Sequence, residues 1–320
     1  MRLDGLHHVT SITGDAPANV EFYTGVLGLR LVKKTVNQDD PTVYHLFYAD
    51  EQGSPGADIT FFEYPGAQQG RAGAGMVHTI VWRVASEEAL DFWAERTGAA
   101  RDGDSVVFPD PEGLRHELVV SHAPDAPLIA DHPEIPSELA LQGFAGVRAY
   151  ARNPELRTAP FLESLGFARD GRRFDTRGAE RGGWIEYEPA PDEPGIPGAG
   201  TVHHVAWSSE LDEQEAWQRR VADAGGRPTE VIDRFWFRSV YFREPSGVLF
   251  EIATKGPGFS TDEDPEHLGE ELILPPAFEH LRSRIEPILT PLPNPRARSG
   301  AGRAGTSARR AARTRASGRG

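Results

Sequence analysis

Two histidine doublets and one distant glutamate are the residues in this sequence whose types and spacing point to metal chemistry. His7-His8 and His203-His204 each lie in a run typical of a β-strand, and Glu251 lies in a later run of the same kind. Two neutral imidazoles and one carboxylate can hold a divalent ion on one face and leave about three coordination positions open. These ligands suit Fe(II), and Mn(II) fits them as well. The chain has no cysteine, which excludes a zinc site built from thiolates.

The strand context limits which of the histidines can share one cavity. Neighbouring side chains on a strand point to opposite faces of the sheet, so only one member of each doublet can face a common site. The spacing alone leaves open which member of each doublet does so.

Each doublet opens one of four segments that repeat the same order of expected elements, namely a strand, a helix and further strands. The segments begin near residues 6, 76, 143 and 201. Their helices are expected at 16–26, 86–96, 154–165 and 212–224, with Ser86 as the N-cap of the second. Residues 111–118 (PEGLRHEL) also match residues 245–252 (PSGVLFEI), which places Glu117 where the last segment has Glu251. The repeats predict an α+β fold of four tandem βαβββ modules.

Proline-rich stretches follow the second and third modules, at 123–136 and 189–200. We divide the chain into a first region of two modules (1–138), a second region of two modules with a C-terminal extension (139–292), and a tail (293–320). The tail has eight arginines and neither acidic nor aromatic residues. We therefore expect it to be disordered and available to an acidic partner.

The composition narrows the classes of partner. The formal net charge is −14, and without the eight arginines of the tail the rest of the chain carries −22. Such a body is not expected to bind nucleic acid. No apolar run approaches the roughly 18 residues of a membrane-spanning helix, and no secretory signal is recognised. With the lack of cysteine, this leads us to expect a cytoplasmic protein without membrane contact.

Several longer motifs surround the candidate ligands. They are Leu-His-His-Val-Thr at 6–10, Phe-Tyr at 22–23, His-His-Val-Ala at 203–206, Gly-Val-Leu-Phe-Glu at 247–251, Tyr-His-Leu-Phe-Tyr-Ala-Asp-Glu at 44–51 and Gly-Phe-Ser-Thr-Asp-Glu-Asp at 258–264. Together they resemble the vicinal oxygen chelate superfamily of glyoxalases, bleomycin resistance proteins and extradiol dioxygenases. More narrowly, they are similar to its hydroquinone ring-cleaving dioxygenases, from about Leu3 to Glu286.

The resemblance implies a fold and a set of ligands. The four modules would form two curved mixed sheets, with the first module facing the fourth and the second pairing with the third. The second histidine of each doublet would bind the metal, so the ligands would be His8, His204 and Glu251. The family also implies catalytic roles for residues around the metal. Carried over to this chain, they are His7, Thr10, His203, Arg234 and Tyr241.

The second and third modules are expected to be a metal-free structural copy of this arrangement. The second module keeps His78 and Glu117 at the positions of His204 and Glu251. The third has Gly146 where the first has His8, so one imidazole is missing. His45 is interpreted as a structural residue.

The function implied by the resemblance is ring cleavage of hydroquinone-type diphenols with O2 by an Fe(II)-dependent dioxygenase. A catechol extradiol dioxygenase is an alternative, disfavoured because those enzymes take both histidines from their later modules. A glyoxalase-like isomerase is another, and it needs a fourth ligand, for which Glu117 is a candidate if the modules pair differently. A non-catalytic protein that binds aromatic compounds is the third. A homo-oligomer is compatible with the sequence.

Overall fold

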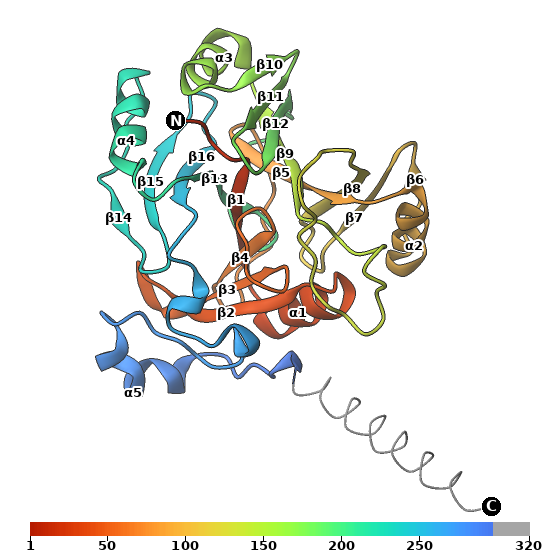
Figure 1. Cartoon of the computed structure of the whole chain (residues 1–320), viewed down its shortest axis with the longest axis vertical. Helices are drawn as coiled ribbons and strands as arrows, with labels where there is room; N and C mark the ends of the chain where they lie inside the picture. Colours follow the sequence, from red (N-terminus) through yellow and green to blue (C-terminus); the bar gives the residue numbers. More distant parts are fainter. Residues whose placement is uncertain (297–320) are drawn as a thin grey trace, which may run out of the picture.

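The computed structural model describes residues 1–296, which form two eight-stranded sheets with the helices on their outer sides (Figure 1). In spatial order, the first sheet consists of β14 (Ile232–Asp233), β15 (Arg238–Arg243), β16 (Leu249–Thr254), β13 (Val202–Ser209), β1 (Leu6–Thr13), β4 (Asp58–Glu63), β3 (Asp40–Ala49) and β2 (Arg30–Asn37). The second consists of β10 (Ala168–Asp170), β11 (Arg173–Arg177), β12 (Gly182–Pro189), β9 (Phe144–Ala151), β5 (Met76–Val84), β8 (Arg115–Val120), β7 (Ser105–Pro109) and β6 (Arg101–Asp102).

Both sheets are mixed and have the same plan. Two module-opening strands pair antiparallel at the centre, β1 with β13 and β5 with β9. Each central strand also pairs parallel with the last strand of its own module, such as β1 with β4 and β13 with β16. The first and fourth modules therefore share one sheet and the second and third share the other, which confirms the predicted fold class and pairing.

The helices follow the predictions at two places and depart from them at two. Helix α2 (Glu87–Thr97) begins after Ser86, whose side chain accepts from the amide of Ala89 at 3.2 Å, and α3 spans Pro154–Leu165. Helix α4 is shorter than expected (Gln214–Asp223), and α1 ends at Val20 (Ala16–Val20). The helix that was expected to continue to residue 26 widens into π-helical turns over Glu21–Val26.

One contact marks the end of α1. The Thr24 hydroxyl donates to the carbonyl of Val20, the last residue of this helix, at 2.7 Å. Hydroxyl groups that bond back in this way disturb the helical ladder.

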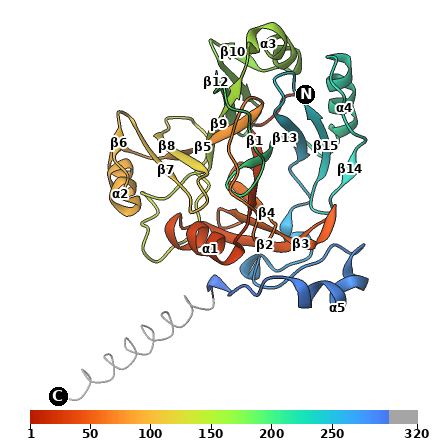
Figure 2. The ribbon, with the colours of Figure 1, turned by 180° about the vertical axis from the view of Figure 1, so that it is seen from behind.

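The C-terminal extension covers the first sheet from below, as both views of the ribbon show (Figures 1 and 2). It contains the short helix α5 (Arg282–Ile285) and 3-10 turns, which lie at Phe259–Thr261, Pro265–His267, Glu279–Leu281 and Glu286–Ile288. Lys34 on β2 donates to the Glu270 carbonyl at 2.9 Å, and this bond fixes the extension against the sheet edge.

The structure describes both regions expected from the sequence, but only the first residues of the expected tail. Each sheet takes strands from both sides of residue 138, so the boundary between 1–138 and 139–292 stays a prediction about the order of repeats. The predicted tail begins inside the described part, where Arg296 pairs with the Glu51 carboxylate. Residues 297–320, with the other seven arginines, lie outside the described residues. Within 1–296, no helix combines the length and apolarity needed to cross a membrane.

Candidate metal centre

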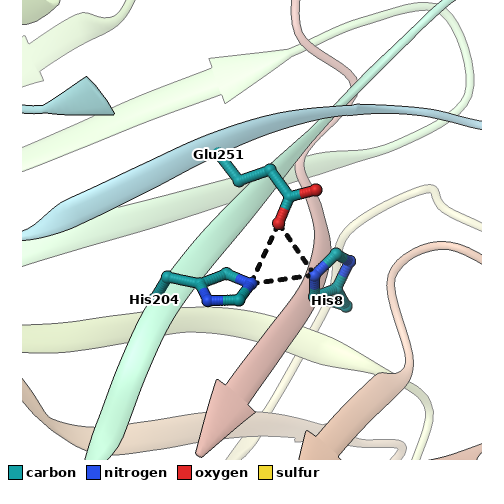
Figure 3. A group of neighbouring side chains, drawn as sticks. All are labelled: His8, His204 and Glu251. Atoms are coloured by element: carbon teal, nitrogen blue, oxygen red, sulfur yellow. Dashed lines mark hydrogen bonds and ion pairs between the residues drawn. The ribbon is translucent and has the colours of Figure 1, made fainter. Parts of the chain in front are cut away.

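Three side chains from the centre of the first sheet meet at one point (Figure 3). His8 lies on β1, His204 on β13 and Glu251 on β16. The Nε2 atoms of the two histidines are 3.2 Å apart, and Glu251 Oε2 lies 3.1 Å from His8 Nε2 and 2.9 Å from His204 Nε2. All three residues are buried. The structure thus brings together the three ligands expected from the sequence.

Strand pairing explains why they converge. Thr10 is opposite His204, so His8, two residues earlier on β1, points to the same face as His204. Ala206, two residues after His204, is the partner of Glu251 on the parallel strand β16. The opposite face carries apolar residues such as Val9, which packs into the core. One face of the central strands therefore builds the core and the other builds the site.

The spacing of the three atoms fits a divalent ion with octahedral geometry. Ligand atoms about 2.1 Å from a metal and at right angles to one another lie about 3.0 Å apart, against about 3.4 Å for a tetrahedral arrangement. The observed separations of 2.9, 3.1 and 3.2 Å agree with right angles. Glu251 Oε2 is buried and has no hydrogen-bond donor directed at it within 1–296, whereas Oε1 accepts from the Ser239 hydroxyl. The residues present therefore fit a facially bound metal.

Hydrogen bonds between the members of each doublet orient the inner imidazoles. His7 Nε2 lies 3.0 Å from the Thr254 carbonyl, to which it can only donate. Burial, together with the neighbouring His8, lowers the pKa of His7 to about 3, so its ring is neutral and Nδ1 is an acceptor. His8 Nδ1, 2.9 Å away, then donates to His7, and His8 Nε2 keeps its lone pair for the pocket.

The second doublet has the same contact, with His203 Nδ1 at 2.8 Å from His204 Nδ1. Burial lowers the pKa of His204, although the nearby Glu251 carboxylate opposes this effect. A neutral imidazole is the form that binds metals. Unlike His7, His203 is exposed at the protein surface.

A small cavity of about 30 Å³ is lined by two of the three ligands, His8 and His204. Its aromatic walls include Phe237, whose ring centroid is 5.4 Å from that of His8, and Phe62, at 6.5 Å from that of His204. Its remaining lining residues are Asn37, Gln38, Asp39, His45, Phe47, Arg234, Trp236 and Tyr241. A larger cavity of about 580 Å³ lies between α1 and the C-terminal extension and contains none of the three ligands.

Two of the five residues expected to surround the metal lie in this cavity. The Tyr241 ring packs 5.6 Å from His204, and burial raises the pKa of the tyrosine, so its hydroxyl keeps its proton. Arg234 extends over the Tyr241 ring at 5.4 Å and pairs with Asp39 through two hydrogen bonds of 2.9 and 3.1 Å. The cavity therefore has a neutral donor and a cation near the metal position.

The other three expected residues do not line the cavity. His7 and His203 lie behind the two ligand imidazoles, and the Thr10 hydroxyl accepts from Thr60 at 2.8 Å. The register of β1 against β13 shifts between Leu6 and Val9 and again between Thr10 and Ser11, so regular alternation is interrupted beside each histidine doublet. Both members of each doublet can therefore lie next to each other. Direct roles for these three residues on a substrate stay predictions.

His45 also lines the cavity, and its imidazole can donate or accept a hydrogen bond. From the sequence, His45 was expected to be only structural. It lies on β3 among aromatic residues, and nothing in its local pattern distinguishes it from a packed strand residue. The signal that could have identified it is its pairing: β3 lies next to β4, which itself pairs with β1.

The equivalent face of the second sheet holds an arginine in place of a metal. The Arg148 guanidinium, from β9, binds the Glu117 carboxylate through Nε at 2.7 Å and Nη2 at 3.1 Å. It also pairs with Glu186. Glu117 is the counterpart of Glu251, so a side-chain cation neutralises it, and it is not available to the first sheet as a fourth ligand.

Comparison with known proteins identifies the family to which this chain belongs. Residues 5–115 and 157–252 match the family profile of the Glyoxalase/Bleomycin resistance protein/Dioxygenase superfamily. MhqO of Bacillus subtilis, named as a ring-cleaving dioxygenase, is 41% identical over 302 residues, which cover 90% of this chain and 96% of MhqO. The chlorohydroquinone/hydroquinone 1,2-dioxygenase of Sphingobium indicum is 34% identical over 312 residues, covering 89% and 95%.

Solved structures of related proteins agree with this family assignment. A Bacillus subtilis protein named as a dioxygenase superposes with a TM-score of 0.83 at 40% identity, covering 91% of this chain and 98% of its own. Glyoxalase I from Zea mays shares the fold alone, with a TM-score of 0.53 at 16% identity over 78% of this chain and 92% of its own. The chain is an enzyme of the dioxygenase group and belongs to the Glyoxalase/Bleomycin resistance protein/Dioxygenase superfamily.

Proposed function

We propose that this protein is an Fe(II)-dependent dioxygenase that cleaves the ring of hydroquinone-type diphenols with O2. The observation that carries the proposal is the convergence of two Nε2 atoms and one carboxylate oxygen at right-angle spacing in a buried pocket with aromatic walls. The relative from Sphingobium indicum, named for hydroquinone and chlorohydroquinone, supports the substrate class. Mn(II) fits the same ligands.

The iron would be held by His8, His204 and Glu251, and it would supply open positions at which a phenol oxygen and O2 are brought together. Phe237 and Phe62 would orient the ring and exclude water from it. Tyr241, with its proton in place, and the cationic Arg234 would stabilise negative charge that develops on oxygen. A volume of about 30 Å³ accommodates little more than water, so the side chains at the mouth must separate to admit a ring.

Two of the alternative functions are disfavoured by the geometry. A glyoxalase-like isomerase needs a fourth ligand, but only three His or carboxylate side chains meet here among residues 1–296, and Glu117 is bound to Arg148. A protein that only binds aromatic compounds does not need three buried ligand atoms that meet at one point. Catechol cleavage uses the same ligands, and the substrate panel below separates it from hydroquinone cleavage.

The proposed function is tested by oxygen consumption. Protein purified without air and reconstituted with Fe(II) is expected to consume O2 with hydroquinone and ring-substituted hydroquinones, faster than with catechol. An oxygen electrode and product spectra measure this. Uptake with catechol alone would assign the protein to catechol cleavage, and no uptake with any dihydroxybenzene would refute the dioxygenase proposal.

His7 is expected to affect iron affinity through His8. Replacing it (His7→Phe) removes the acceptor of the His8 Nδ1 proton, so His8 is free to turn or to carry its proton on Nε2. Loss of such an orienting partner typically weakens metal binding about 10- to 100-fold. Anaerobic titration with Fe(II) would measure the change. His203→Phe should weaken binding less, because His203 is exposed and has no second anchor like Thr254 within the described chain; equal effects would contradict the orienting role of the Thr254 bond.

A further inference from the structure

His45 lines the same cavity as the ligand imidazoles of His8 and His204. Its ring packs against Phe47 and Phe62, with centroids at 4.0 and 4.4 Å. The Phe62 ring centroid in turn lies 6.5 Å from that of His204. Phe62 therefore packs next to both His45 and a ligand imidazole.

A chain of hydrogen bonds fixes which nitrogen of His45 carries the proton. Thr60 donates its hydroxyl proton to Thr10 Oγ1 at 2.8 Å, so Thr60 Oγ1 can only accept from His45 Nε2, which is 2.9 Å away. Burial, followed by the neighbouring His8 and His204, lowers the pKa of His45 well below its ordinary value and keeps the ring neutral. Nδ1 is then left with a lone pair, and it has no hydrogen-bond partner among residues 1–296.

These features leave a hydrogen-bond acceptor for a ligand that enters the cavity. His45 and the ligand imidazoles of His8 and His204 line one aromatic-walled space. A para-diphenol has oxygens at opposite ends of its ring, so one can lie at the metal position while the other extends along the cavity. In an ortho-diphenol both oxygens lie at the same end.

We propose that His45 Nδ1 accepts the hydrogen bond of the diphenol hydroxyl that is remote from the metal. The inference rests on the proposed function and names the group that selects a para-diphenol. As the ring gives up electron density to O2, this hydroxyl becomes more acidic and its hydrogen bond to Nδ1 strengthens. The proton stays on oxygen, because burial and the neighbouring imidazoles hold the pKa of His45 well below its ordinary value. Thr60 and Thr10 act as positioning residues that hold Nδ1 toward the substrate.

The test uses His45→Phe in the full chain. The phenylalanine ring keeps the aromatic wall but has no atom that accepts a hydrogen bond. We expect kcat/KM for hydroquinone to fall about 10-fold, a typical contribution of one hydrogen bond. The preference of the unmodified protein for hydroquinone over 4-methoxyphenol, which lacks the second proton, should largely disappear in the variant. Anaerobic calorimetry should show weaker binding of hydroquinone, with unchanged iron content and binding of 4-methoxyphenol.

Two further variants keep the test decisive. His122→Phe changes an exposed histidine remote from the cavity and should leave all of these quantities unaltered. If His45→Phe loses iron or melts early, Thr60→Val decides, because it keeps His45 but removes the partner that fixes Nε2–H. It should reduce the same substrate preference.

The outcomes separate the two proposals. If the unmodified protein consumes O2 with hydroquinone and His45→Phe, or Thr60→Val in its place, keeps both the rate and the preference over 4-methoxyphenol, the role of His45 is overturned while the proposed function stands. If the unmodified protein consumes no O2 with any diphenol, the proposed function fails, and the role of His45 fails with it.

Discussion

Replacing Glu251 with glutamine is expected to remove both bound iron and oxygen uptake. The substitution keeps the shape of the side chain but exchanges the only anionic ligand for a neutral amide, which leaves two imidazoles to hold a divalent ion. We expect a loss of activity on the order of 1,000-fold or more, beyond the 10- to 100-fold typical of residues that only orient a ligand. Metal analysis of protein prepared without air, together with oxygen uptake, measures both effects.

The second sheet offers a matched control. Glu117→Gln makes the same change at the equivalent position, where the carboxylate binds Arg148 and not the three converging ligands. This variant is expected to lose some stability but to keep its iron. If Glu251→Gln retained one iron per chain, or if Glu117→Gln lost it, the assignment of the metal to the first sheet would be wrong.

Replacing Lys33 with methionine is expected to cause the largest loss of stability. The Lys33 ammonium is completely buried between β2 and the C-terminal extension. It donates to Asp262 Oδ1 at 2.8 Å and to the Phe259 carbonyl at 3.3 Å, and it also pairs with Glu263. Removing it leaves two carboxylates without their cation, which typically costs about 3–5 kcal/mol of the free energy of unfolding. Denaturant unfolding at constant pH would measure the loss.

This ion cluster also supports the cavity wall. Trp236 donates through Nε1 to both oxygens of Asp262 and lies under the Lys33 ammonium, 4.9 Å from it. Trp236 lines the cavity, so Lys33→Met should lower activity as well as stability.

A neighbouring lysine provides the comparison for this prediction. Lys34→Met removes a single bond to the Glu270 carbonyl and should cost only about 1 kcal/mol. Adding Asp262→Asn and Glu263→Gln to Lys33→Met should recover part of the loss, because no uncompensated carboxylate then remains. Equal costs for the two lysines, or no recovery in the triple variant, would contradict the account.

The metal ligands could be predicted from the sequence because their signal is repeated. Two similar doublets open two modules, and internal repetition aligns Glu251 with Glu117. The choice of the second histidine in each doublet came from the family resemblance, since strand alternation alone left it open. The two sheets and the pairing of modules followed from the same repeats and resemblance.

The surroundings of the ligands could not be predicted in the same way. The contact between His7 and His8 depends on shifts in the register of β1, which sequence alternation does not reveal. His45 approaches the ligands only because β3 and β4 are stacked beside β1, and its role depends on the Thr60 hydroxyl. In the second sheet, Arg148 takes up Glu117 through a contact between modules that no local pattern indicates. Location in the cell and any acidic partner of the tail stay predictions.

The position of the iron is the most direct test of the central claim. Crystals of the protein grown without air and loaded with Fe(II), measured at the iron absorption edge, should give one anomalous peak about 2.0–2.3 Å from His8 Nε2, His204 Nε2 and a Glu251 oxygen. A peak bound by other residues, or none at this position in iron-loaded crystals, would contradict the account.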